Sequence, residues 1–131
     1  MTVEISLQWD SELAAVQRDI CAQFGADYLP CHPGMRLGLA SNVTAATRNL
    51  NGVRIVPSGD ACGWYLWAGD ELAEPPEFYI PLRAQNIETW APRAMAYLGL
   101  PPGWRFLLRE DRIDVWKDLT LLSPAESVVA V

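Results

Sequence analysis

The chain of 131 residues has no uninterrupted apolar run close to the roughly 20 residues that a membrane span requires, so no transmembrane helix is expected. It begins MTVEISLQWDSEL, without the basic start and apolar centre of a secretory signal. Its formal net charge is -6, which disfavours binding to a phosphate backbone. We therefore expect a cytoplasmic protein that binds neither membrane nor nucleic acid.

Cysteine and histidine are too few for an evident reactive or metal site. Cys21, Cys31 and Cys62 are odd in number and lie at spacings that suit neither a zinc site nor a disulfide framework. The single histidine, His32, follows Cys31 directly, but neighbours in an extended segment point to opposite sides and should not form a dyad. No glycine-rich phosphate loop is present. We expect no catalytic residue, metal or cofactor, although a distant partner, Cys21 or Cys62, stays an open alternative.

Apolar and aromatic residues are what the chain does have. Hydrophobic residues make up 50% and charged residues 20%, a composition that is too apolar for a disordered chain. On a prior of roughly 100–200 residues per domain, the length indicates a single domain over residues 1–131. We expect most of the six tryptophans to form an aromatic core, because tryptophan buries a large area wherever its NH finds an acceptor. They are Trp9, Trp64, Trp67, Trp90, Trp104 and Trp116.

The first element expected is a helix over residues 11–24. Ser11 can accept hydrogen bonds from the first turn, and Gly25 can end the helix in the left-handed conformation. Apolar residues recur at helical spacing and predict one core-facing stripe. They are Leu13, Val16, Ile20 and Phe24.

Residues 28–69 change to a pattern of strands and turns. Apolar residues at alternate positions predict an extended segment, and they are Leu37, Leu39 and Val43. Asn51-Gly52 predicts a tight turn before a strand at 53–56, and residues 57–60 predict a second turn. Residues 62–68 are apolar at consecutive positions, which indicates a central strand or one with a buried face and a binding face.

The second half predicts one more helical segment and a hairpin. Residues 70–81 have loop composition, with three prolines among acids. Residues 84–98 return to helical spacing, and Pro92 should interrupt that segment. Residues 104–117 read as a hairpin and 123–131 as a flexible tail. Together, this order of helix, strands, helical segment and hairpin predicts an α+β fold with a largely antiparallel sheet.

Most of the negative charge is concentrated in residues 58–90, where six acids and Arg83 give a net charge of -5. This stretch is either a solvated face or a docking surface for a cationic partner. Trp67 directly precedes its acidic loop, and an aromatic residue beside acids is typical of an interface hot spot. The candidate partner-binding residues are therefore Trp67, Asp70, Glu71, Glu74 and Glu77, with Asp60 at the rim.

Four blocks of sequence together resemble a known family. They are NGVR at 51–54, GWYLWAG at 63–69, YLGLPPGWRFL at 97–107, and DVW at 114–116 followed by Asp118. In this order they are similar to the bacterial immunity-protein family 33-like, from polymorphic toxin systems. The resemblance covers about residues 30–122 and leaves the first helix outside. It implies a cytoplasmic antidote without catalysis of its own, which binds a toxin made by the same cell or its kin.

The leading hypothesis is thus an immunity protein that neutralises a cognate toxin through an acidic and aromatic surface. A basic toxin, such as a nuclease domain, would suit that surface. The alternative is a non-catalytic adaptor or regulatory protein-binding module of a secretion system. A third reading is a small enzyme that uses Cys31 or His32, which a thiol titration without an unusually reactive cysteine would remove.

Overall fold

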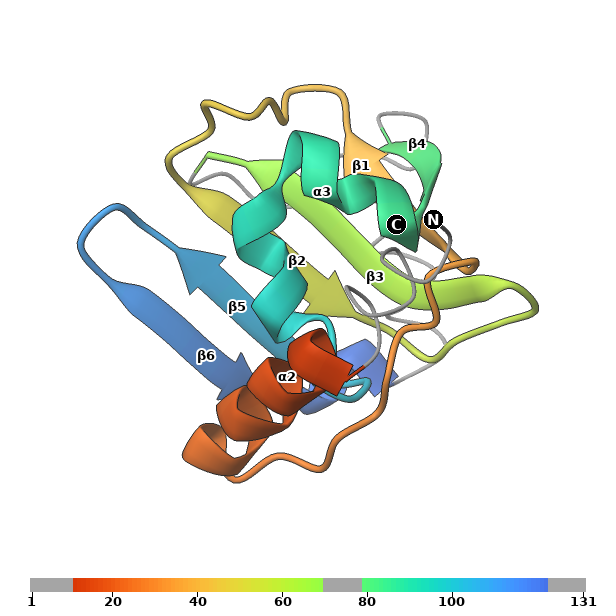
Figure 1. Ribbon diagram of the computed structural model, residues 1–131, viewed down its shortest axis with the longest axis vertical. Helices are drawn as coiled ribbons and strands as arrows, with labels where there is room; N and C mark the ends of the chain where they lie inside the picture. The colour runs from red at the N-terminus through yellow and green to blue at the C-terminus, as the bar shows by residue number, and fades with distance from the viewer. Residues whose placement is uncertain (1–10, 70–78, 123–131) are drawn as a thin grey trace.

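The computed structural model describes residues 11–69 and 79–122, which build a six-stranded sheet in the order β4-β1-β3-β2-β5-β6 (Figure 1). The pairing of β1 with β3 is parallel, and the other four pairings are antiparallel. This confirms the predicted α+β fold with a largely antiparallel sheet. The strands are β1 (Arg36–Ala40), β2 (Leu50–Arg54), β3 (Ala61–Ala68), β4 (Tyr79–Arg83), β5 (Trp104–Leu108) and β6 (Ile113–Lys117).

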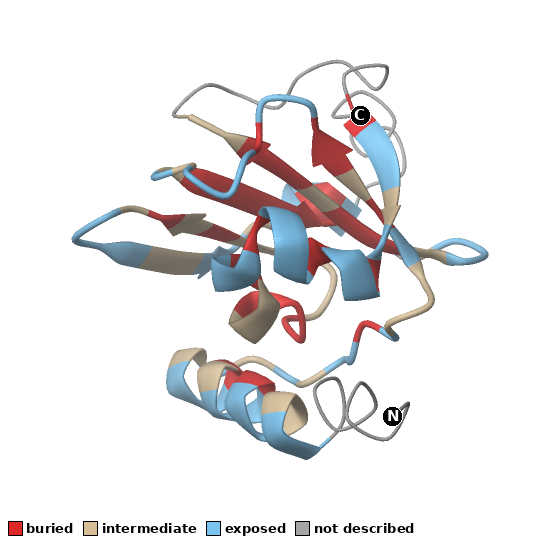
Figure 2. Cartoon of the chain, turned by 45° about the horizontal axis from the view of Figure 1, so that its top comes forward, coloured by how far each residue is buried: buried red, intermediate tan, exposed pale blue. Residues whose placement is uncertain are grey.

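One face of the sheet carries helical segments, and the N-terminal helix packs outside them (Figure 2). The predicted first helix is α2 (Ser11–Phe24), and Gly25 ends it at a φ of 72°. The predicted second helical segment is present in three short pieces, with Pro92 at the start of the last one, as expected of a residue without an NH. These pieces are η2 (Ala84–Asn86), α3 (Ile87–Trp90) and η3 (Pro92–Tyr97), and a further turn, η4 (Leu119–Leu122), follows β6.

The core-facing stripe of α2 differs from the predicted one. Val16 is 47% exposed, whereas Gln17 and Cys21 are buried against η3 and the loop after it. The Gln17 amide donates to the Met95 carbonyl at 2.8 Å and accepts from the Tyr28 hydroxyl at 3.2 Å. Because both ends of its amide are hydrogen-bonded, this polar side chain can be buried at small cost.

The predicted turn at Asn51-Gly52 was wrong, because both residues lie inside β2. Gly52 is opposite Leu66 on β3 and Phe106 on β5, and a Cβ atom there would lie 2.3 Å from the Phe106 ring. The glycine therefore serves close packing rather than chain reversal. The predicted turn at residues 57–60 is present, with Gly59 at a φ of 58°.

β3 is a central strand, as its apolar sequence predicted, and lies between β1 and β2. The Trp64 indole on β3 donates to the Leu98 carbonyl at 2.9 Å, so this side of the sheet faces the helical segments. The predicted loop at 70–81 is corrected at its end, where residues 79–81 belong to strand β4. Residues 70–78 and the predicted tail at 123–131 lie outside the described residues.

Candidate functional site

The predicted partner-binding residues fall into three groups. Asp70, Glu71, Glu74 and Glu77 lie outside the described residues. Trp67 is only 2% exposed, so its ring belongs to the core and its prediction as an accessible anchor is corrected. β3 lies between β1 and β2, so side chains of two neighbouring strands flank the indole and help to remove it from water.

Asp60 is exposed at the turn between β2 and β3, as a rim residue should be, but it is paired with Arg36. The two side chains form an ion pair at 2.9 Å, and the Arg36 NH also donates to the Asp60 carbonyl at 2.8 Å. The hydrogen bond from Arg36 holds the pKa of the Asp60 carboxyl below its usual range. Asp60 therefore stays ionised while Arg36 balances its charge.

This ion pair stands at one end of a hollow of about 340 Å³ over β1, β3 and β4. Tyr65 lines the hollow, and it points away from the helical segments because it alternates with Trp64 along β3. Its ring meets Tyr79 edge-to-face, with centroids 5.3 Å apart. The hollow thus has aromatic walls and one charged end.

A second, apolar groove of about 180 Å³ lies beside β4 and α3. Ile80 and Trp90 on its rim are 56% and 43% exposed, although both are large hydrophobic side chains. Trp90, rather than Trp67, is therefore the accessible indole at this end of the sheet. The groove is lined by Leu39, Ala40, Ser41, Val43, Ile80, Leu82 and Trp90.

Both hollows adjoin β4, which pairs with β1 and with no other strand among the described residues. Pro81 lies within this edge strand and cannot donate a backbone hydrogen bond. Along the sequence, the acidic residues 70–77 immediately precede β4. Residues 11–69 and 79–122 hold nine acids and ten bases, so the negative excess comes from the remaining segments.

Arg54, the last residue of β2, is a buried arginine that binds several neighbouring segments of the chain. Arg54 is 1% exposed and donates to four backbone carbonyls, while its guanidinium lies 5.7 Å from the centre of the Trp64 ring. Burial lowers the pKa of its guanidinium, since the charged form loses water. The four bonds are to Cys62 at 2.9 Å, Leu29 at 2.8 Å, Leu100 at 2.9 Å and Leu98 at 3.3 Å.

Two of the three cysteines meet beside this guanidinium. Cys31 and Cys62 are 4% and 0% exposed. The hydrogen bond between their side chains raises the pKa of the Cys31 thiol, and it lowers the pKa of the Cys62 thiol to about 7. Cys21 is separate, with its thiol directed at the Gly99 carbonyl at 3.4 Å. Sequence spacing gave no sign that Cys31 and Cys62 would meet.

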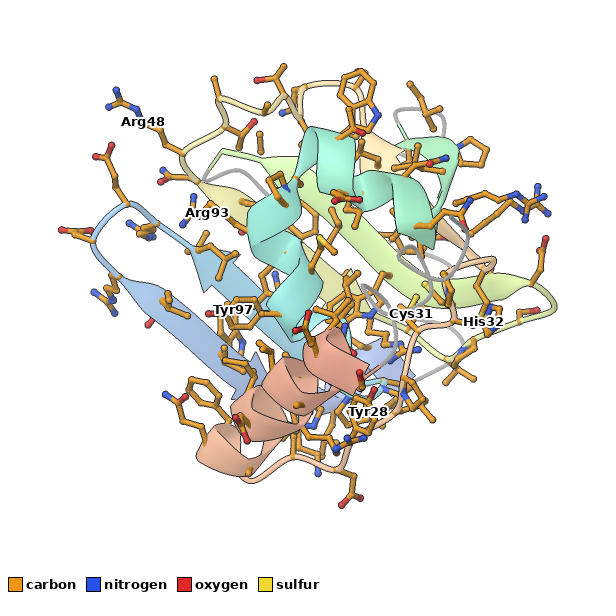
Figure 3. The ribbon with its side chains drawn as sticks, in the orientation of Figure 1. Tyr28, Cys31, His32, Arg48, Arg93 and Tyr97 are labelled. Atoms are coloured by element: carbon orange, nitrogen blue, oxygen red, sulfur yellow. The ribbon has the colours of Figure 1, made fainter. Side chains whose placement is uncertain are left out.

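His32 takes no part in the cysteine pair. It is exposed, whereas its neighbour Cys31 is buried (Figure 3), and its Nδ1 accepts from the Gly34 NH at 3.1 Å. The expectation that Cys31 and His32 point to opposite sides is confirmed. Within 11–69 and 79–122, no three His, Cys, Asp or Glu side chains are grouped to hold a metal ion. No helix in the same ranges has the length and apolar character needed to cross a membrane.

Comparison with known proteins gives one match. A family model described as Imm33-like domain matches residues 16–118. The match includes most of α2, which the sequence motifs left outside, and all six strands of the sheet. Searches of the curated proteins and of the solved structures found no match.

Proposed function

Because the chain belongs to the Imm33-like domain family, we propose that it is an immunity protein that binds a bacterial toxin in the cytoplasm and blocks it without catalysis of its own. The family match over residues 16–118 carries this proposal. An antidote that acts by occlusion needs an accessible, complementary surface rather than reacting groups. The separation of Cys31 from His32 supports the same reading, since the pair offers no nucleophile with an adjacent base.

We place the contact at the β4 edge of the sheet. The apolar groove between Ile80 and Trp90 offers a place for one aliphatic or aromatic side chain of the toxin. Pro81 disfavours the addition of a further strand, so side-chain docking fits this edge better than strand pairing.

The toxin that fits this surface is basic, as a nuclease domain would be. Asp70, Glu71, Glu74 and Glu77 precede the groove in sequence, and no base lies between residues 70 and 78. Opposite charge speeds association and orients the partner. The apolar groove supplies the desolvated anchor that charge alone does not provide. We keep Asp60 only as a rim residue, because it lies at the first hollow on the other face of β4 and Arg36 already balances its charge.

The test is co-expression of the chain with the toxin domain encoded beside its gene. Restored growth and a stable complex of the two purified proteins support the proposal. A complex without restored growth favours the alternative, an adaptor or regulatory module. No complex with that toxin domain contradicts the proposed function.

Reversing three acids of the loop tests the charge argument. Asp70→Lys, Glu71→Lys and Glu74→Lys together should weaken toxin binding by about tenfold at low salt, because a single charge contributes modestly to the binding of an oppositely charged partner. Calorimetric titration measures the effect. The matched control reverses three exposed acids elsewhere, Asp19, Asp27 and Asp111, and should change the affinity by less than about twofold. Equal affinities for both triple variants would rule out the acidic loop as the contact.

Placing a charge in the groove tests the apolar anchor separately. Ile80→Asp should weaken toxin binding by about tenfold, because a desolvated carboxylate would face the apolar side chain of the toxin. Val56→Asp is the matched control, since Val56 is 55% exposed and Ile80 is 56% exposed. Thermal unfolding checks that both variants fold. An unchanged affinity for Ile80→Asp would exclude the groove while leaving toxin binding itself intact.

A further inference from the structure

We propose that β6 pairs with β6 of a second copy of this chain, so that two sheets join edge to edge in a homodimer. This edge is at the opposite end of the sheet from β4, where the toxin contact is proposed, so the proposal is independent of toxin binding. Within residues 11–69 and 79–122, β6 pairs with β5 alone, and Figure 1 shows it as the outermost strand on its side of the sheet.

The outer edge of β6 lacks two of the devices that prevent a further strand from pairing. Proline and bulges commonly protect the edge strands of monomeric proteins. β4 has Pro81, whereas β6 contains no proline, and its five residue pairs with β5 follow one uninterrupted register. Ile113 and Trp116, on opposite faces of β6, are 50% and 37% exposed. A strand added at this edge would therefore remove large hydrophobic side chains from water.

The backbone groups of alternate residues point outward from β6. The Asp118 NH donates to the Gly103 carbonyl at 2.6 Å, and the Arg109 NH donates to the Arg112 carbonyl at 2.7 Å. Because backbone groups alternate in direction along a strand, the even-numbered residues of β6 face β5 and the odd-numbered residues face away. The outward groups belong to Ile113, Val115 and Lys117.

These outward groups favour one antiparallel register for two copies. With Val115 opposite Val115 of the second copy, Ile113 lies opposite Lys117, and three residue pairs can each exchange two hydrogen bonds. A shift of two residues in one direction sets Asp114 opposite Asp114, and a shift in the other direction sets Asp114 opposite Asp118. Like charges directly opposite destabilise a strand pair, so the register centred on Val115 is preferred.

The side chains of this register are complementary between the copies. Arg112 lies opposite Asp118 of the second copy at both ends of the paired strands, so each end joins a cation with an anion. Lys117 lies opposite Ile113, where its aliphatic stem can cover the exposed isoleucine while its ammonium stays in water. Because one strand supplies both halves of every pair, as a two-fold axis requires, the fitting partner is a second copy of this chain.

Sedimentation velocity of the purified chain over a wide range of concentration tests the proposal. We expect the mean mass to rise with concentration from that of the monomer to twice that value. Val115→Pro removes an outward NH but none that donates to β5, and it should weaken dimerisation by at least about tenfold. Val115→Thr is the matched control, because it keeps the NH and a β-branched side chain, and it should still dimerise. Thermal unfolding checks that both variants fold.

Engineered cysteines test the register even if the proline variant fails to fold. Residues opposite one another in a hydrogen-bonded pair have Cα atoms about 5.5 Å apart, which a disulfide can span. Val115→Cys should therefore link two copies on mild oxidation. Ile113→Cys should not, because the two copies of residue 113 are offset along the strands by about 13 Å, and adding Lys117→Cys to it should restore the link. The three native cysteines are buried and can remain.

The outcomes that overturn the proposal are distinct. A monomer at every concentration, without a link through Val115→Cys, would leave the edge unpaired. A dimer that a folded Val115→Pro variant does not weaken would assign the contact to another surface. A link through Ile113→Cys alone would assign it to another register. A monomer that loses toxin binding on Val115→Pro would assign the edge to a strand of the toxin.

Discussion

Replacing Arg54 by methionine is expected to lower the free energy of unfolding by about 3–5 kcal/mol. Methionine keeps the unbranched stem of the side chain as far as the position of Nε, but it lacks the rest of the guanidinium and removes every donor. Four backbone carbonyls would then lose this donor: the partly buried one of Leu29 and the buried ones of Cys62, Leu98 and Leu100. Urea unfolding followed by tryptophan fluorescence measures the loss, since the indole of Trp64 lies against the guanidinium.

The expected loss is large because the acceptors come from three separate parts of the chain. Replacing a buried ion pair by apolar residues can be neutral when both partners are removed. Here the acceptors are backbone groups that no substitution of Arg54 removes. The Leu98 carbonyl keeps its bond from Trp64, but the buried carbonyls of Cys62 and Leu100 lose the Arg54 donor. Arg54→Lys should therefore lose less, about 2 kcal/mol, because an ammonium keeps the charge but cannot reach every carbonyl.

The matched control for this variant is Arg112→Met. Arg112 lies 3.1 Å from Asp114, but its side chain is 69% exposed, so its removal should change stability by less than about 0.5 kcal/mol. A loss below about 1 kcal/mol for Arg54→Met would show that water or backbone movement satisfies the carbonyls. The buried guanidinium would then not hold the junction between β2, β3 and the loop after η3.

The helix end, the helix break and the turn that depend on residues close together in the sequence were predicted correctly. The bounds of α2 follow from the apolar spacing that ends at Gly25, and the break at Pro92 follows from its missing NH. The turn at residues 57–60 likewise depends on local chemistry, with Gly59 in the left-handed region. Each of these features is determined by neighbours in sequence, which a single chain displays directly.

Features that depend on distant partners could not be predicted in this way. Asn51-Gly52 has the composition of a turn, and only the ring of Phe106 on a strand fifty residues later explains the glycine. Gln17 is polar, and its burial depends on the carbonyl of Met95. Long-range contacts of this kind override local propensity.

The same limit applies to the candidate site. Trp67 and Trp90 both stand beside acids or polar residues in sequence, yet the sheet covers Trp67 and leaves Trp90 on a groove. Which of the two indoles is accessible depends on the assembled fold, because Trp67 is on the central strand β3, whereas Trp90 is at the end of α3 beside the edge strand β4. Strand order is a property of the whole fold that alternation of apolar residues does not encode.

Gly52 provides a second stability test. Here we expect replacement by alanine to lower the stability of the fold, whereas the same replacement within a strand usually raises it. A glycine in the middle of a strand normally gains stability when it is replaced by alanine, by roughly 0.5–1 kcal/mol. At Gly52 the added Cβ would lie 2.3 Å from Phe106 and 2.9 Å from Leu66. Phe106 cannot move away freely, because its ring packs against Trp64 and Tyr97 with centroids 5.3 and 5.4 Å apart.

We therefore expect Gly52→Ala to destabilise the fold by about 2–3 kcal/mol in urea unfolding. Gly34→Ala is the control, because its Cβ would meet only the exposed His32 ring at 3.4 Å and should change stability by less than about 0.5 kcal/mol. A smaller partner should relieve the overlap, so the double variant Gly52→Ala with Phe106→Leu should cost at least about 1 kcal/mol less than the sum of its single variants. Additive losses would mean that the strand shifts as a whole, and that the contact between Gly52 and Phe106 does not set the spacing of β2 and β5.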